Sequence, residues 1–297
     1  MRESAVLFGA AKSLVGVVSD PPVDSNQIGV LFLNAGFTHR VGPQRMSVRF
    51  ARDLAKLGFT CLRFDHAGIG DSRRRMDNIP FAEAAIEDGV AAMDFLQSTR
   101  GIERFIVAGV CWGADNAVRV CEADPRVIGV LAVDFYSVPT VRHLFRVYPA
   151  RLLVARSWAN ILRGRSRIFS QFKAFVVAVA KSLVEGKSES DDILPAMPPD
   201  GVVKLIRQLV DRGVFLSFAF ASSAVSYDQY VGKFRRPMAE LAPTGRLEVG
   251  VFKAADHLFT LRHNQAKLWE FTEKWARGVA EHHANGHGAV SGGKQGP

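Results

Sequence analysis

A five-residue segment, 109–113, with glycine at both ends and cysteine at its centre, constrains the fold of this chain most. It follows the apolar run 104–108, which predicts a buried strand, and precedes residues 114–121, which predict a helix. A turn that joins strand and helix so tightly leaves no room for bulky side chains beside its centre, so glycine flanks it. The central side chain, that of Cys111, is then exposed at the sheet edge, in the geometry of a nucleophile elbow.

Cys111 is the candidate nucleophile. The positive end of the following helix favours the thiolate, which is the reactive form of cysteine. The alternative is that Cys111 is a small apolar residue at the end of a core strand, as free cysteines often are. Its two flanking glycines and the strand-to-helix context favour the nucleophile. Cys61 and Cys121 fall in a predicted strand and on the elbow helix, and both are expected in the core.

Apolar strands alternate with helices along most of the chain, which predicts an α/β fold with a mostly parallel, doubly wound sheet covered on both faces. A short hairpin is expected at 4–8 and 13–19. The expected strands are 28–33, 59–64, 104–108, 127–133, 214–220 and 247–252, and the expected helices are 43–57, 81–98, 114–121, 201–212, 225–241 and 260–279.

The alternation stops at residue 138 and resumes near residue 201. We therefore divide the chain into a core, 1–137 and 201–280, and a helical lid insertion, 138–200, which would overhang the edge where ligands of open α/β sheets bind. Residues 281–297 are rich in Gly, His and Ala without periodicity and are predicted to be a disordered tail.

The net charge of +9 is unevenly distributed along the chain. No Asp or Glu occurs from 135 to 184, whereas that stretch contains nine cations, which are Arg142, Arg146, Arg151, Arg156, Arg163, Arg165, Arg167, Lys173 and Lys181. Such a segment suits an anionic carrier or membrane surface, and no nucleic-acid motif accompanies it. With three cysteines, no clear signal peptide and no long apolar run, a cytoplasmic location is expected. The oligomeric state is left open.

One of the eight histidines, His257, is the candidate base. A cysteine nucleophile needs a base within hydrogen-bond reach, and the base usually needs an orienting acid. His257 follows the last predicted strand, so its loop is expected at the same sheet edge as the elbow. Asp256 is adjacent to it in sequence and is poorly placed to hold the ring, so we interpret it as structural.

The chain resembles the α/β-hydrolase superfamily, and more narrowly the serine-aminopeptidase-like and exosortase-associated hydrolases. The resemblance rests on the motifs Asn34-Ala35-Gly36-Phe37, Arg63-Phe64-Asp65-His66-Ala67-Gly68-Ile69-Gly70-Asp71-Ser72, the Gly109–Gly113 elbow and Asp256-His257. It implies the α/β-hydrolase fold and an oxyanion hole made by the backbone N–H groups of Phe37 and Trp112.

The acid departs from the family pattern. The family usually places Asp after the strand that is expected to end at Phe220, where this chain has Ala221-Ser222-Ser223-Ala224. Asp134, at the end of the preceding sheet strand, and Asp228, in the next helix, are the two candidates. The third possibility is a Cys111–His257 dyad without an acid.

The sequence therefore predicts a hydrolase that cleaves an ester or thioester of a small-molecule or carrier-bound substrate through a Cys111 acyl-enzyme. The alternatives are an acyltransferase that passes the acyl group to an alcohol or amine, and a non-catalytic ligand-binding protein with the same fold. No cofactor is expected, because Gly68-Ile69-Gly70 lacks the third glycine of a dinucleotide motif. No residues show metal-ligand spacing, so no metal is expected.

Overall fold

The computed structural model describes residues 1–22, 25–136 and 197–288. They form an eight-stranded sheet of order β1-β2-β4-β3-β5-β6-β7-β8. Its strands are β1 (Arg2–Phe8), β2 (Leu14–Asp20), β3 (Ile28–Phe32), β4 (Thr60–Phe64), β5 (Arg104–Val110), β6 (Val127–Val133), β7 (Phe215–Ala221) and β8 (Leu247–Phe252). The pairs β1–β2 and β2–β4 are antiparallel, and all the other pairs are parallel. The carboxyl ends of β3 to β8 therefore meet at one edge.

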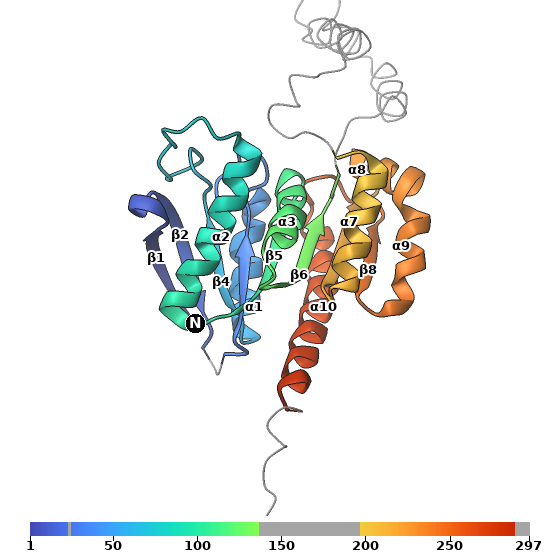
Figure 1. Ribbon diagram of the computed structural model, residues 1–297. Helices are drawn as coiled ribbons and strands as arrows, with labels where there is room; N and C mark the ends of the chain where they lie inside the picture. The colour runs from blue at the N-terminus through green and yellow to red at the C-terminus, as the bar shows by residue number, and fades with distance from the viewer. Residues whose placement is uncertain (23–24, 137–196, 289–297) are drawn as a thin grey trace, which may run out of the picture.

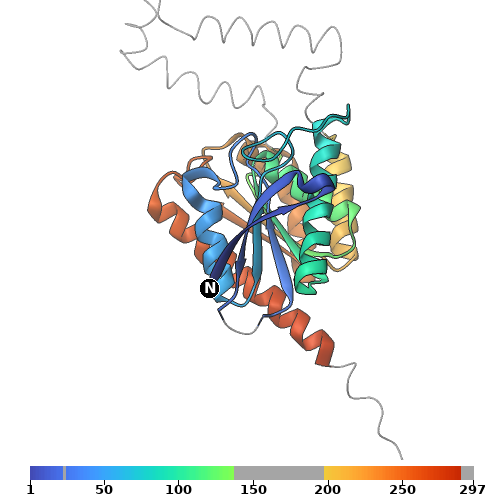
Figure 2. The ribbon, with the colours of Figure 1, turned by 90° about the vertical axis from the view of Figure 1, so that its left-hand side faces the viewer.

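Helices cover both faces of the sheet (Figures 1 and 2). One face is covered by α1 (Met46–Lys56) and α10 (Arg262–Gly288), and the other by α2 (Phe81–Arg100), α3 (Trp112–Ala123) and α7 (Pro199–Asp211). The connection from β7 to β8 contains α8 (Val225–Gln229), a π-helical turn (Tyr230–Phe234) and α9 (Arg235–Leu241). Two apolar layers result, as a buried parallel sheet requires.

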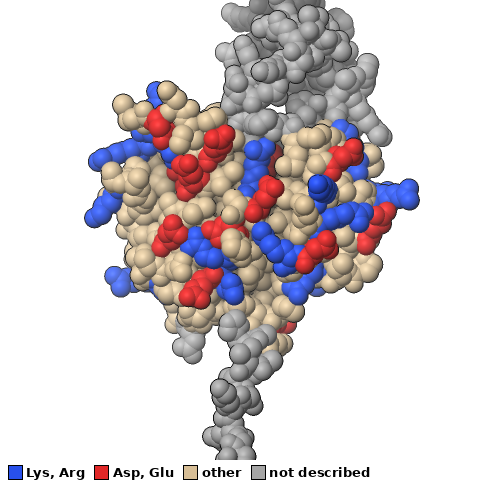
Figure 3. All heavy atoms as spheres, in the orientation of Figure 1, with Lys and Arg blue, Asp and Glu red and all other residues tan. Residues whose placement is uncertain are grey.

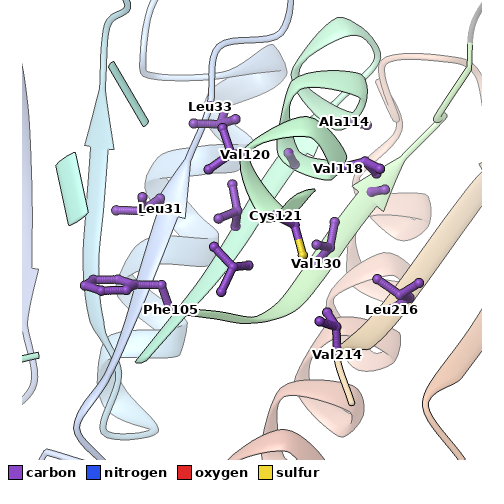
Figure 4. Packing of buried hydrophobic residues seen from close by; sticks show 14 of the residues in the cluster. Leu31, Leu33, Phe105, Ala114, Val118, Val120, Cys121, Val130, Val214 and Leu216 are labelled. Carbon is purple, nitrogen blue, oxygen red and sulfur yellow. The ribbon is translucent and has the colours of Figure 1, made fainter. Parts of the chain in front are cut away.

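The elbow helix α3 is packed against the centre of the sheet. Its Ala114, Val118, Val120 and Cys121 are at most 2% exposed and face strand residues such as Leu31 (Figure 4). This packing fixes the start of α3 relative to β5. The turn between these two elements therefore has a rigid support.

The expected order of strands and helices, and the mostly parallel sheet, are confirmed. Two details differ. The helix expected over 225–241 is divided by the π-helical turn. The tail predicted from residue 281 was wrong over its first part, because α10 continues to Gly288. His282 packs edge-on against Phe215, with ring centroids 5.1 Å apart, and its Nε2 lies 3.0 Å from Arg246 Nη2. These tertiary contacts stabilise the last part of α10, where the sequence shows no helical periodicity.

The predicted lid lies almost entirely outside the described residues, and so do the nine cations of the stretch 135–184. On the face shown in Figure 3, cationic and acidic side chains of the core are interspersed. Within the described ranges, no helix is both long and apolar enough to span a membrane.

Candidate functional site

Cys111 lies at the turn between β5 and α3 with φ 56° and ψ −122°, a strained backbone conformation for a residue with a side chain. The two flanking glycines are required by close backbone contacts. A Cβ on Gly109 would lie 2.1 Å from the carbonyl oxygen of Gly113, and a Cβ on Gly113 would lie 2.5 Å from that of Asn34. The turn thus presents the half-buried Cys111 side chain at the carboxyl end of β5.

His257, in the loop between β8 and α10, is held by Asp134, the residue that follows β6. The distance from His257 Nδ1 to Asp134 Oδ2 is 2.9 Å, and Asp134 is fully buried. This hydrogen bond is the largest cause that raises the pKa of His257 from 6.5 to about 10, followed by a hydrogen bond with the Cys111 side chain, while burial lowers it. The structure therefore brings Cys111, His257 and Asp134 together.

The carboxylate of Asp134 is fixed from its other side. Its Oδ1 accepts hydrogen bonds from the backbone N–H of Ala221 and from Ser226 Oγ, both at 2.8 Å. Ser226 lies on α8 and is fully buried. Ser226 was not among the site residues predicted from the sequence. A sequence signal for it does exist, because Ser226 follows the end of β7 by five residues and so lies at the same edge of the sheet as Asp134.

The other acidic candidates occupy different places. Asp228 is half-buried on α8, and Asp134 rather than Asp228 is bonded to His257 Nδ1. Asp256 Oδ1 accepts the backbone N–H groups of Leu258 and Thr260 at 3.1 and 2.9 Å, which closes the turn after the histidine. This is the structural role expected for Asp256. A dyad without an acid does not describe the arrangement.

The loop after β3 places Phe37 beside the elbow. Gly36 has φ +58°, and the backbone N–H of Thr38 donates to the carbonyl of Ala35 at 3.1 Å. Asn34 Nδ2 donates to Thr38 O at 2.8 Å and to Asp65 Oδ1 at 3.1 Å. Among the hydrogen bonds of the described chain, the backbone N–H groups of Phe37 and Trp112 are not used as donors.

Comparison with known proteins agrees with this architecture. Residues 29–133 match a family described as alpha/beta hydrolase fold. An esterase from Pyrococcus furiosus aligns with a TM-score of 0.58 at 17% identity, over 92% of this chain and 91% of the esterase. The chain has the α/β-hydrolase fold. An α/β serine hydrolase without lid from Xanthomonas campestris aligns with a TM-score of 0.55 at 12% identity, over 93% and 94% of the two chains.

A relative found by sequence matches a smaller part of the chain than these structures do. An uncharacterized protein of Pseudomonas aeruginosa is 29% identical over 100 residues, which make up 33% of this chain and 27% of that protein. The esterase domain of a Rhodothermus marinus protein is similar in structure, with a TM-score of 0.55 at 16% identity over 93% of this chain and 98% of that domain. At these identities the structural likeness establishes the fold alone.

Three aromatic side chains lie close together at the start of α3. The Phe81 and Trp112 rings stack with centroids 4.5 Å apart, and Phe37 lies 6.0 and 6.2 Å from them. Phe37 is 73% exposed, and Leu258, next to the histidine, is 43% exposed. The surroundings of Cys111 are therefore apolar on the side of Phe37.

The described residues also contain one cluster with metal-ligand side chains, formed by His39, Asp65 and Asp71. Arg40 Nη1 is bonded to Asp65 and lies 2.8 Å from Asp71 Oδ2. The hydrogen bond and charge of Arg40 also lower the pKa of Asp71. The guanidinium thus supplies the positive charge at these carboxylates. Asp65 also accepts hydrogen bonds from Asn34 Nδ2 and from the backbone N–H of Arg40, so the cluster stabilises the loop that contains Phe37.

Proposed function

We propose that this chain is a cysteine hydrolase that cleaves an ester or thioester through an acyl-enzyme on Cys111. The observation that carries the proposal is the 2.9 Å hydrogen bond between His257 Nδ1 and the buried carboxylate of Asp134. The half-buried side chain of Cys111 is close enough to His257 to contribute to its raised pKa. The raised pKa of His257 favours an imidazolium beside the sulfur at neutral pH, and an imidazolium stabilises a thiolate. Some structural relatives are named serine hydrolases and others esterases. In this proposal Cys111 takes the part that serine has in a serine hydrolase.

The first half-reaction forms the acyl-enzyme. The Cys111 thiolate attacks the carbonyl carbon, and the carbonyl electron pair moves onto oxygen, where the backbone N–H groups of Phe37 and Trp112 would stabilise it. When this intermediate collapses, the bond to the alkoxide or thiolate leaving group breaks. The leaving group takes a proton from His257 Nε2, and the acyl group remains on sulfur as a thioester.

The second half-reaction transfers the acyl group to water. Neutral His257 takes a proton from water, and the resulting hydroxide attacks the thioester carbonyl. Collapse expels the Cys111 thiolate beside the imidazolium and releases the carboxylic acid. Asp134 stabilises the imidazolium in both half-reactions.

We further propose that the substrate carries an apolar acyl group and an anionic carrier. The exposed ring of Phe37 and its aromatic neighbours support the first part. The second part is supported by the sequence alone, through the nine cations of the stretch 135–184, which contains no Asp or Glu. Attraction by these cations weakens with salt, so kcat/KM for an anionic ester should fall with ionic strength faster than that for a neutral ester of equal chain length. Parallel curves would contradict a role for the cations.

Turnover of p-nitrophenyl esters and acyl thioesters by the wild type and by Cys111→Ala tests the proposal. We expect the alanine variant to lose activity while keeping the wild-type circular dichroism spectrum and Tm. Equal turnover by both proteins would contradict it.

Adding an alcohol or amine acceptor separates hydrolysis from acyl transfer, because transfer gives a new ester or amide in place of the free acid. Turnover that proceeds only when the acceptor is present would make the chain an acyltransferase.

A further inference from the structure

The buried carboxylate of Asp134 is oriented by groups from two separate segments. Its Oδ2 faces His257 Nδ1 at 2.9 Å, whereas Oδ1 accepts hydrogen bonds from Ala221 N–H and Ser226 Oγ. Asp134 itself has φ +53°, and its backbone N–H donates to the carbonyl of Ala219 at 2.8 Å. The position of the acid is thus determined by β7 and α8 rather than by its own strand alone.

The two donors to Oδ1 differ in kind. The N–H of Ala221 belongs to the last residue of β7, so any residue except proline would supply it. The hydroxyl of Ser226 is a side-chain donor, and its residue lies 92 positions from Asp134 in the sequence. Both Ser226 and Asp134 are fully buried, so water does not reach this side of the carboxylate to replace a lost donor.

We propose that Ser226 is a positioning residue, which acts through Asp134 to hold His257 in its productive orientation. This inference rests on the proposed function. Two donors on Oδ1 prevent rotation of the carboxylate about its Cβ–Cγ bond and aim Oδ2 at the imidazole. Removal of the Ser226 hydroxyl takes away one of the donors that hold Oδ1 and leaves a less well-directed hydrogen bond to His257.

Three substitutions at Ser226 separate the effect of the hydrogen-bond donor from the effect of side-chain volume. Ser226→Ala removes the hydroxyl, Ser226→Cys keeps a similar volume with a weak donor, and Ser226→Thr keeps the donor. Ser217→Ala is the matched control. Ser217 is fully buried on β7, and its hydroxyl has no hydrogen-bond partner in the part of the chain that the structure describes.

Steady-state kinetics with the best ester or thioester substrate is the first readout. We expect Ser226→Ala and Ser226→Cys to lower kcat about tenfold with little change in KM, because ground-state binding does not involve the acid. Ser226→Thr should stay near the wild type, and Ser217→Ala should match it. Wild-type kcat in folded Ser226→Ala and Ser226→Cys variants would overturn the proposal.

Proton NMR of the His257 Nδ1 proton is the second readout and needs no substrate. We expect this resonance to move upfield in Ser226→Ala and to stay in place in Ser217→Ala, because the hydrogen bond to Asp134 weakens only in the former. An unchanged resonance in Ser226→Ala would overturn the inference. Failure of the proposed function has a different signature, since Cys111→Ala would then turn over substrate like the wild type.

Discussion

His257 Nδ1 lies 2.9 Å from Asp134 Oδ2, although the two residues are 123 positions apart in the sequence. The contact joins the loop after β8 to the end of β6, two strands that are not adjacent, because β7 lies between them. The β7 strand takes part through Ala221 N–H, which donates to the same carboxylate. The relationship places a carboxylate beside His257 although no carboxylate follows β7 directly.

Replacement of Asp134 tests this relationship. Asp134→Asn keeps the shape of the side chain but removes the charge that stabilises the imidazolium. We expect kcat to fall by a factor of about 100 or more, with a much smaller change in KM. Steady-state kinetics measures both values. Asp228→Asn is the control and should keep near-native rates, so a large loss in that variant together with an active Asp134→Asn would reverse the assignment.

The stability of the protein should depend on the charge of His257. Its pKa is about 10 in the folded state, against an ordinary histidine value of 6.5 that the unfolded chain is expected to show, so the folded state binds the proton more tightly. The stabilisation is fully present below pH 6.5 and is lost as the pH rises through about 10. Urea unfolding between pH 6.5 and 10 should therefore show a steeper loss of stability for the wild type than for His257→Gln. Equal slopes would contradict the raised pKa.

The elbow glycines should be intolerant of any side chain. Gly113→Ala places a Cβ 2.5 Å from the backbone oxygen of Asn34, which cannot move without shifting the loop that leads to Phe37. We expect a loss of about 1–3 kcal/mol in the free energy of unfolding, measured by urea titration. Gly278→Ala is the control. It lies on α10 with open space around the added Cβ and should stabilise the protein by about 0.5–1 kcal/mol.

The exposed ring of Phe37 should contribute to substrate binding. In Phe37→Ala the backbone N–H is retained, so the proposed oxyanion hole remains while the apolar contact is lost. We expect KM for a long-chain ester to rise severalfold and KM for an acetyl ester to change little. Met76→Ala, at a residue that is 96% exposed, should leave both values unchanged. Equal effects of Phe37→Ala on the two esters would argue against apolar recognition at this ring.

Much of the fold could be predicted because strands such as β3, β4 and β5 are short apolar runs, each followed by a turn and a helix. The elbow was also predictable, since Gly109 and Gly113 reflect a local backbone constraint. The choice between Asp134 and Asp228 was not, because it depends on which residue lies opposite His257 after three strands have paired. Ser226 was missed for the same reason, since its partner is 92 residues away. His282 shows that tertiary contacts extend α10 into a segment whose composition predicts disorder.

The reactivities of the three cysteines provide a separate check on the environment of Cys111. Burial raises the pKa of the Cys121 thiol to about 12 and that of the Cys61 thiol further. Cys111 is half-buried, and its side chain contributes to the raised pKa of His257. Iodoacetamide at neutral pH should therefore alkylate Cys111 first and abolish turnover, as peptide mapping would show. Preferential labelling of Cys61 or Cys121 in the folded protein would contradict this picture.

The central claim is that Cys111 carries the acyl group during turnover. Intact-protein mass spectrometry after rapid acid quenching of a reaction with an acyl thioester tests it most directly, followed by peptide mapping of the adduct. His257→Gln should slow release of the acyl group, and Cys111→Ala gives the blank. We expect a mass increase equal to one acyl group, located on Cys111 and absent from Cys111→Ala. An adduct on another residue, or substrate turnover without Cys111, would contradict it.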